Sequence, residues 1–249
     1  MKREFSVEFS QVSLFSGREA RSGVMTFGLG YGEFIVFLGR EESGKEVLLE
    51  LCVGVTAPAQ GTVKVFGVDW VIANPTEEVQ LRQRVGEVFP KPGLLHDMTV
   101  FENVALLPRY YLFTEDRVDE LVMRSLSAFG LRDHRSKFPE ELSGYHSRLV
   151  ALARARGLGQ ELIVIDDPFT GLDEDEAVQL MSVFESLRMD GKVTIIVGLG
   201  TASPLLDLAD RVALVHGGRI IEMGTLDEVY ESLDEESAKV YVKNASHMA

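Results

Sequence analysis

One short stretch, Gly39 to Glu46, constrains the fold of this chain more than any other. It reads Gly-Arg-Glu-Glu-Ser-Gly-Lys-Glu, follows the apolar run 34–38 and leads into the apolar run 47–52. A buried strand, a loop bounded by glycines and ending in Gly-Lys, and a helix together form a cradle for phosphate groups. Seven of the eight positions fit the pattern G-x-x-x-x-G-K-[ST], and the eighth, where a hydroxyl would bind Mg²⁺, is Glu46.

Length and composition predict an ordinary globular protein. At 249 residues, with 45% hydrophobic and 26% charged residues, the chain can form one α/β domain with an inserted subdomain. No apolar run approaches the roughly 18 residues of a membrane span, and residues 1–5 contain no apolar signal core, so we expect no secretion. The single cysteine, Cys52, excludes an intrachain disulfide and fits a reducing compartment. The net charge of −14 argues against binding nucleic acid or anionic lipid through the surface alone.

Continuous β-branched runs separated by helical stretches predict a mostly parallel sheet covered by helices on both faces. The predicted strands of this sheet are 34–38, 85–89, 162–167, 193–197 and 211–215. Alternating stretches at 5–9 and 62–67 predict a smaller antiparallel β subdomain. The fold class is therefore α/β, with a core built around the phosphate-binding loop.

Residues 91–157 change to a helical pattern, which we interpret as a helical subdomain inserted into a single domain, 1–249. Thr99 is placed to cap one helix, residues 115–129 carry a one-sided apolar stripe, and Ser143 begins another helix. Further helices are predicted at about 175–189 and within 226–242.

Four more motifs accompany the loop: Leu142-Ser143-Gly144-Tyr145-His146, Leu162 to Pro168, Phe169 to Asp173, and Leu208 to Val212. Their order and spacing, over nearly the whole chain, resemble those of the ATP-binding subunit of ABC transporters. Within this family, the sequence of residues 93–104 is most similar to that of the phospholipid-transport (Mla/Mce-type) branch.

The resemblance implies an ATP-binding and Mg²⁺-binding subunit that docks on a membrane permease at the inner face of the cytoplasmic membrane, without nucleic acid. Two such domains, in a homodimer or a heterodimer, would pair head to tail, so that the signature 142–146 of one faces the loop of the other. Asp166 matches the aspartate that holds Mg²⁺, Glu46 is a second candidate metal ligand, and Asp167 takes the position of the catalytic glutamate. The positions implied for nucleotide binding are Phe15, Gly39, Arg40, Glu41, Glu42, Ser43, Gly44, Lys45, Glu46, Ser143, Gly144 and Asp173.

The chain departs from the family pattern at the positions that carry chemistry. Glu42 replaces a glycine, Glu46 a Ser or Thr, Pro90 the Q-loop glutamine, Tyr145 and His146 the end of the signature, Asp167 a glutamate, and Gly200 the switch histidine. ATP brings about four negative charges, and each like-charge pair at ~4 Å costs roughly 1 to 4 kcal/mol. We therefore expect weak or absent ATP binding and weak or lost hydrolysis, and whether the chain is an enzyme stays open.

Other interpretations remain beside this one. Asp166 and Asp167 fit a structural carboxylate pair at a strand end, His146 fits a helix cap, and Trp70 with Tyr110-Tyr111 fits either the core or an interface. The chain as a whole also fits a non-catalytic scaffold that binds a permease or an intact ATPase without nucleotide. A third possibility, intermediate between the ATP-binding subunit and the scaffold, is an active heterodimer with a related chain. A DNA-repair or translation ATPase is disfavoured because coiled-coil and basic extensions are missing.

Overall fold

The computed structural model describes residues 5–14 and 23–232. The remaining residues, 1–4, 15–22 and 233–249, are outside this description, and so is the predicted adenine-stacking residue Phe15.

A six-stranded sheet forms the centre of the molecule, in the order β10-β9-β3-β8-β7-β6. All neighbours in it run parallel except β9 and β10, which form an antiparallel edge. Its strands are β3 (Phe34–Leu38), β6 (Val85–Val88), β7 (Leu162–Asp166), β8 (Thr194–Leu199), β9 (Arg211–His216) and β10 (Arg219–Gly224). The predicted α/β class is confirmed.

The central strands are buried along their whole length because helices or a second sheet cover both faces. Every residue of β3 and β8 is buried, and the pairing Val36–Val197 fixes the register between them. Such runs of Val, Ile, Leu and Phe are typical of strands covered on both sides.

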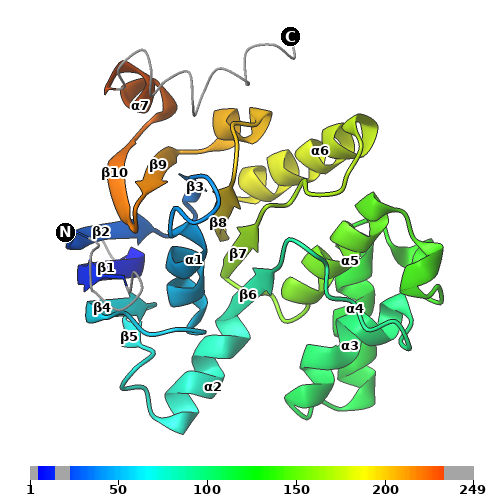
Figure 1. Ribbon diagram of the computed structural model, residues 1–249. Helices are drawn as coiled ribbons and strands as arrows, with labels where there is room; N and C mark the ends of the chain where they lie inside the picture. The colour runs from blue at the N-terminus through cyan, green and yellow to red at the C-terminus, as the bar shows by residue number, and fades with distance from the viewer. Residues whose placement is uncertain (1–4, 15–22, 233–249) are drawn as a thin grey trace.

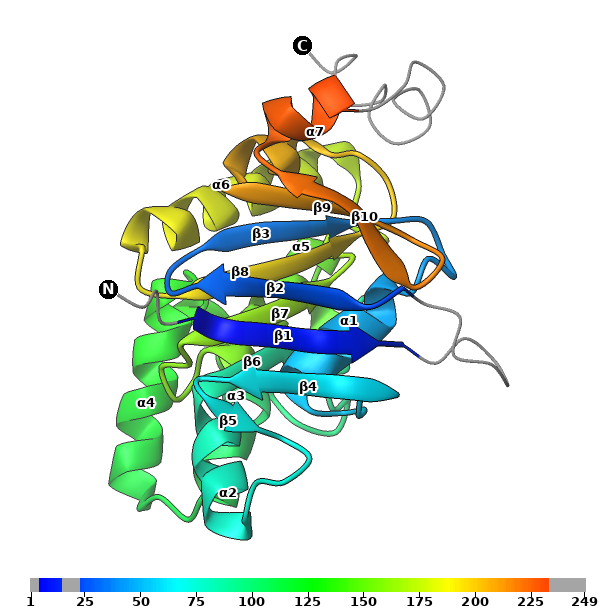
Figure 2. The ribbon, with the colours of Figure 1, turned by 90° about the vertical axis from the view of Figure 1, so that its left-hand side faces the viewer.

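A second, antiparallel sheet has the order β2-β1-β4-β5 and is seen in front in Figure 2. Its strands are β1 (Phe5–Ser13), β2 (Met25–Gly30), β4 (Gln60–Val65) and β5 (Val68–Asp69). Helix α1 (Lys45–Val53) packs between the two sheets, because Leu48, Leu51 and Cys52 share one hydrophobic cluster with Phe9 of β1 and Phe37 of β3. This packing fixes the start of α1, and with it the phosphate-binding loop.

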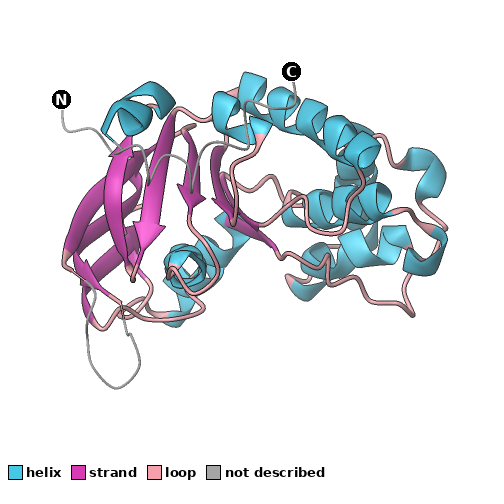
Figure 3. Ribbon diagram, turned by 45° about the horizontal axis from the view of Figure 1, so that its top comes forward, coloured by secondary structure: helices cyan, strands magenta, loops and turns pink. Residues whose placement is uncertain are grey.

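Figure 3 shows the strands gathered on one side and most helices on the other. Between β6 and β7 the chain forms α3 (Val100–Tyr110), α4 (Glu115–Ala128), η1 (Arg132–His134), η2 (Pro139–Glu141) and α5 (Gly144–Ala155). Thr99 caps α3 in a capping box with Glu102, as its position predicts. The interpretation of 91–157 as a separate subdomain stays a prediction.

The other helices are α2 (Pro75–Arg84), α6 (Glu174–Asp190), η3 (Pro204–Leu208) and α7 (Leu226–Ser232). Strand β10 is not among the strands that the sequence predicts; Gly217 and Gly218 join it to β9 in an antiparallel pair. Of the predicted closing helices, α7 is present and the rest lies outside the described residues.

Candidate nucleotide site

The loop from Gly39 to Gly44 joins the end of β3 to the start of α1 (Figure 1). Both glycines are needed: a Cβ on Gly39 would lie 2.7 Å from the Val215 carbonyl oxygen, and Gly44 has a φ of 94°. Glu42 also has a positive φ, 64°, which is uncommon for a residue with a side chain. The backbone at Glu42 thus keeps the conformation that glycine favours, while its side chain is acidic.

Lys45 is the first residue of α1 and is only 2% exposed. Its ammonium group bonds the Glu46 carboxylate and lies 3.9 Å from Asp166 Oδ1 and 3.9 Å from Asp167 Oδ2. Burial lowers the pKa of Lys45, but the hydrogen bond to Glu46 and the charges of all three carboxylates outweigh burial, and the pKa is raised above its ordinary value. Lys45 is therefore charged and already surrounded by anions of its own chain.

Asp166, the last residue of β7, has a buried acceptor oxygen, Oδ1, that receives no hydrogen bond from the described residues. Burial, reinforced by Asp167 and Glu46 and opposed by Lys45, raises the pKa of Asp166 to about 6. A buried carboxylate oxygen that accepts no hydrogen bond suits a bound cation.

The carboxylates here fit Mg²⁺ held jointly with phosphates better than Mg²⁺ alone. In the described chain, no group of three or more His, Cys, Asp or Glu side chains could hold a metal ion. Mg²⁺ commonly takes one or two carboxylates and completes its shell with water and substrate phosphates. Asp166 fits this role, whereas the Glu46 carboxylate is engaged with Lys45.

Asp167 follows β7 with a φ of 39°, again in the positive region. Its Oδ1 accepts the backbone N–H of Gly200 at 3.1 Å, which orients the carboxylate toward the lysine. A Cβ added to Gly200 would come no closer than 3.6 Å, to Asp167 Oδ2, which is ordinary contact. Position 200 therefore has room for the start of a larger side chain, and its missing imidazole does not result from crowding there.

The signature residues are set apart from the loop. Ser143 is the N-cap of α5, and Asp173 is the N-cap of α6. Within residues 5–14 and 23–232, no hydrogen bond or ion pair links Ser143, Gly144 or Asp173 to the loop. The structure thus brings together Gly39, Gly44, Lys45, Glu46, Asp166 and Asp167, but not the signature. The exposed members of the predicted set are Arg40, Glu41, Glu42, Ser143, Gly144 and Asp173, while Ser43 is buried.

Arg148 is a residue of this region that the sequence analysis missed. It is 2% exposed, and its guanidinium donates to the carbonyl oxygens of Phe89 (2.9 Å), Pro90 (2.6 Å) and Thr170 (2.9 Å). Burial lowers the pKa of Arg148, opposed by the nearby charge of Asp167. One side chain of α5 thereby ties the segment after β6 to the segment after β7. A basic residue beside the apolar run 149–153 was the available signal.

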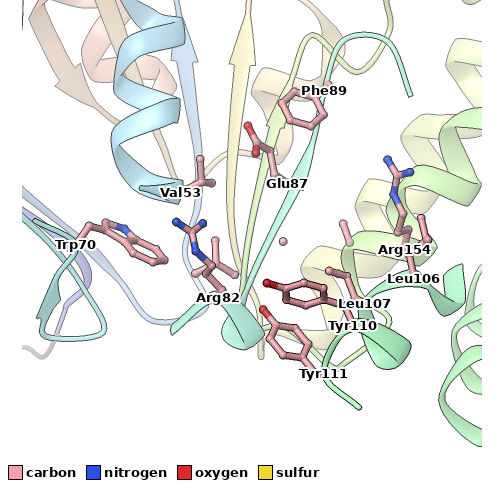
Figure 4. A pocket seen from close by; sticks show the side chains of 13 residues that line it. Val53, Trp70, Arg82, Glu87, Phe89, Leu106, Leu107, Tyr110, Tyr111 and Arg154 are labelled. Carbon is pink, nitrogen blue, oxygen red and sulfur yellow. The ribbon is translucent and has the colours of Figure 1, made fainter. Parts of the chain in front are cut away.

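A groove of about 510 Å³ lies where α1, α2 and β6 face α3 and α5. Figure 4 shows the rings of Tyr110 and Tyr111 pointing toward Arg82, with Trp70 on the other side of the guanidinium. Its further labelled lining residues are Val53, Glu87, Phe89, Leu106, Leu107 and Arg154. Trp70 is thus partly buried against the hydrophobic cluster that contains α1, whereas Tyr110 is exposed, and an interface role for these residues stays a prediction.

Glu87 is the unpaired charge of this groove. Arg82 pairs with Glu78, and Arg154 donates to the carbonyl oxygens of Pro92 and Gly93. The side chain of Glu87, in contrast, forms no ion pair or hydrogen bond in the part of the chain that is described. Burial, followed by the charges of Glu50 and Asp166, raises its pKa to about 7. An acidic residue inside the apolar strand 85–89 was the signal that the sequence analysis did not use.

A glycine-bounded loop before a helix, with a buried lysine facing carboxylates at the end of a parallel strand, defines a P-loop nucleotide-binding fold. The ABC transporter family model matches residues 23–170, more than half of the chain. The chain therefore belongs to the family of ABC transporter ATP-binding domains.

Individual relatives agree with this assignment. The chain is 32% identical over 222 residues to the energy-coupling factor transporter ATP-binding protein EcfA2 of Lactococcus lactis subsp. lactis, covering 88% of this chain and 77% of that protein. It is 30% identical over 199 residues to the methionine import ATP-binding protein MetN of Carboxydothermus hydrogenoformans, covering 80% of this chain but 59% of that protein. Among solved structures, CbiO1 of Clostridium perfringens, part of the ABC transporter complex cbiONQ, matches with a TM-score of 0.81, 20% identity and 92% coverage of both chains. These relatives do not support the phospholipid branch that residues 93–104 predict.

None of the helices in the described part of the chain is long and apolar enough to cross a bilayer.

Proposed function

We propose that this chain is the ATP-binding subunit of an ABC transporter, that it docks on a membrane permease, and that it hydrolyses ATP weakly or not at all. The observation that carries the proposal is the surroundings of Lys45. The lysine stands buried at the base of a phosphate-binding loop, as nucleotide binding requires, but its charge is shared among three carboxylates of the chain itself.

Nucleotide binding is weakened rather than abolished in this proposal. ATP supplies oxygens for Lys45 and, with Mg²⁺, a cation for Asp166 Oδ1, which accepts no hydrogen bond from the described residues. It must first displace Glu46 from Lys45. The remaining nucleotide contacts are proposed for the loop residues Gly39 to Gly44 and, from a second copy or a related chain, for Ser143, Gly144 and Asp173.

Hydrolysis is weakened for a different reason. Asp167 is the candidate general base, but its Oδ1 is bound by the Gly200 N–H at 3.1 Å. The side chain at position 200 supplies no imidazole for a phosphate, and Pro90 supplies no amide. Proton abstraction requires a base within about 2.6–3.2 Å of the attacking water, and Asp167 is one methylene shorter than the family's glutamate.

The groove around Glu87 supports docking on a partner. Its aromatic lining is open to solvent, with Tyr110 75% and Phe89 49% exposed, and an apolar concave patch of this kind is typical of a protein interface. A permease would bring the chain to the inner face of the cytoplasmic membrane. The related MetN is a methionine importer by its name, and the name of EcfA2 gives no transported substrate, so the proposal commits to no substrate class.

The proposal is tested by calorimetry of the purified chain with ATP, with and without Mg²⁺, and by phosphate release. We expect weak binding that requires Lys45 and slow or no release. The combined variant Glu46→Ser, Asp167→Glu and Gly200→His is expected to recover hydrolysis, because position 200 has room at Cβ. The same variant carrying Lys45→Ala is the control. Wild-type turnover equal to that of ordinary transporter ATPases would disprove the proposed impairment.

A second function, a scaffold that binds a permease or an intact ATPase without nucleotide, is favoured by one observation. The Lys45–Glu46 pair satisfies the lysine without any ligand. No binding of ATP to wild type or to Glu46→Ser, together with retained permease binding, would support the scaffold and exclude the first proposal.

A further inference from the structure

The start of α5 is already occupied by a carboxylate of the same chain. Glu176 Oε1 accepts the backbone N–H of Tyr145 at 3.1 Å. Its other oxygen, Oε2, lies 3.0 Å from where a Cβ on Gly144 would stand. The carboxylate therefore sits directly on the first turn of the helix that carries the signature.

Few donors remain there for another anion. A helix begins with N–H groups that have no partner within the helix. At α5, His146 N–H is taken by the Ser143 hydroxyl at 3.3 Å, and Tyr145 N–H is taken by Glu176. The Ser143 hydroxyl also contacts His146 Nδ1 at 3.0 Å. The Ser143 hydroxyl and the N–H groups of Tyr145 and His146 are thus engaged within the chain.

The direction of Glu176 differs from that of similar glutamates in this chain. Glu176 is the third residue of α6, and Glu77 and Glu102 hold the same position in α2 and α3. Both of these accept the backbone N–H of their own N-cap residue, at 2.9 Å and 2.8 Å. Such reciprocal capping is the usual role of a glutamate there. Glu176 instead reaches across to another helix, 31 residues away in sequence.

A second position is available to the same carboxylate. Asp173 caps α6 by accepting the Glu176 N–H at 2.8 Å, and the N–H of Asp173 itself bonds no acceptor among the residues that the structure describes. By turning back to Asp173 N–H, Glu176 would complete the capping box and release Tyr145 N–H.

From these contacts we propose that Glu176 is an internal competitor for phosphate at the signature. The signature engages the nucleotide held by a second chain only after Glu176 has left Tyr145 N–H for its own helix. This inference rests on the proposed function, because that function brings a triphosphate to this surface. It makes the signature face self-inhibited, which neither the fold nor the family assignment implies.

The test follows the backbone amide of Tyr145 by NMR in the ¹⁵N-labelled full chain while inorganic phosphate is added. In Glu176→Ala we expect phosphate to shift this amide resonance at a concentration lower than in wild type by about fivefold or more, the factor for removing a like charge at ~4 Å in water. Glu176→Gln, which keeps the side-chain shape, should behave in the same direction. Glu77→Ala removes an equivalent capping glutamate elsewhere and should behave like wild type. Equal midpoints in all four proteins, or no response in either Glu176 variant, would overturn the inference.

Calorimetry with ATP on the same proteins separates this inference from the proposed function. The Glu176 variants should bind ATP at the loop as wild type does, and should dimerise with ATP more readily. A phosphate response at Tyr145 without any ATP binding would support the competition by Glu176 and exclude the proposed function. ATP binding without the phosphate response would support the proposed function and exclude the competition by Glu176.

Discussion

Replacing Glu46 is the most direct test of what limits the affinity of this site for nucleotide. The Glu46 carboxylate bonds the Lys45 ammonium, and the lysine is 2% exposed while the Glu46 side chain is 38% exposed. An incoming phosphate must take over the lysine and then lie beside the displaced carboxylate. Two like charges ~4 Å apart repel by about 1 kcal/mol in water and by about 4 kcal/mol at an effective dielectric constant of 20.

Because Glu46 is partly exposed, we expect the lower part of this range, about 1–2 kcal/mol. Glu46→Gln should therefore bind ATP about 5- to 30-fold more tightly than wild type in the absence of Mg²⁺. Glu46→Ser should match this gain and add a further gain in Mg²⁺, since a hydroxyl at this position can bind the metal. Isothermal titration calorimetry with ATP, with and without Mg²⁺, measures both effects.

The two substitutions also test whether Glu46 is a metal ligand. If the carboxylate coordinated Mg²⁺, Glu46→Gln would bind Mg-ATP less tightly than wild type while still gaining affinity for metal-free ATP. If neither variant gained affinity for metal-free ATP, the reasoning from the Lys45–Glu46 pair would be refuted. Glu77→Gln, on the exposed start of α2, is a control for removing one negative charge from the chain.

Three further predictions concern the surroundings of the site. Arg148→Gln should lower the free energy of unfolding by about 2–4 kcal/mol, because the buried guanidinium is lost and three partly buried carbonyl groups lose a charged donor. A urea-unfolding midpoint equal to wild type would contradict this prediction. Burial raises the pKa of Glu87 from 4.5 to about 7. Between these pH values the folded chain binds more protons than the unfolded chain. The contribution of Glu87 to the free energy of unfolding is therefore complete below pH 4.5 and is lost as the pH rises to about 7. Glu87→Gln should consequently stabilise the protein at pH 8 by about 1 kcal/mol, after allowance for partial exposure, with no gain below pH 4.5, as urea unfolding at the two pH values would show. Gly86→Ala should destabilise the packing of β6 on α5, because the new Cβ would lie 2.2 Å from the Ala155 carbonyl oxygen. The midpoint of thermal unfolding of this variant should therefore fall. Gly67→Ala, in open space but with a φ of 82°, is the control for backbone strain alone.

The parts of the fold that the sequence predicts are those with a strong local signal. The strand 34–38 and the loop that follows it are recognisable because an apolar run and two glycines stand at fixed spacing. The Thr99–Glu102 capping box is equally local, since its two members are three residues apart. Strand β10 was missed because it is an edge strand of mixed exposure with no clear alternation.

The missed side chains depend on contacts that no local pattern encodes. Arg148 reaches acceptors 59, 58 and 22 residues away, so its role exists only once α5 has packed on the ends of β6 and β7. Glu87 is charged inside an apolar strand, and only the fold shows that its side chain faces an open groove. The loop substitutions could be identified from the sequence, but not that Glu46 turns toward Lys45.

The two surfaces at which a triphosphate would be held share one physical property. At the loop, Glu46 holds Lys45, and at the signature, Glu176 holds Tyr145 N–H. In both places the donor meant for a phosphate oxygen is satisfied by a carboxylate oxygen of the same chain, so nucleotide binding is an exchange of one anion for another. The free chain then loses no buried hydrogen bond when nucleotide is absent, because its own carboxylates replace the ligand. Each single substitution therefore removes only one of the two competing carboxylates, Glu46 at the loop or Glu176 at the signature. Glu46→Gln and Glu176→Gln together should promote ATP-dependent dimerisation more than either does alone, because a nucleotide clamped between two chains meets both carboxylates at once.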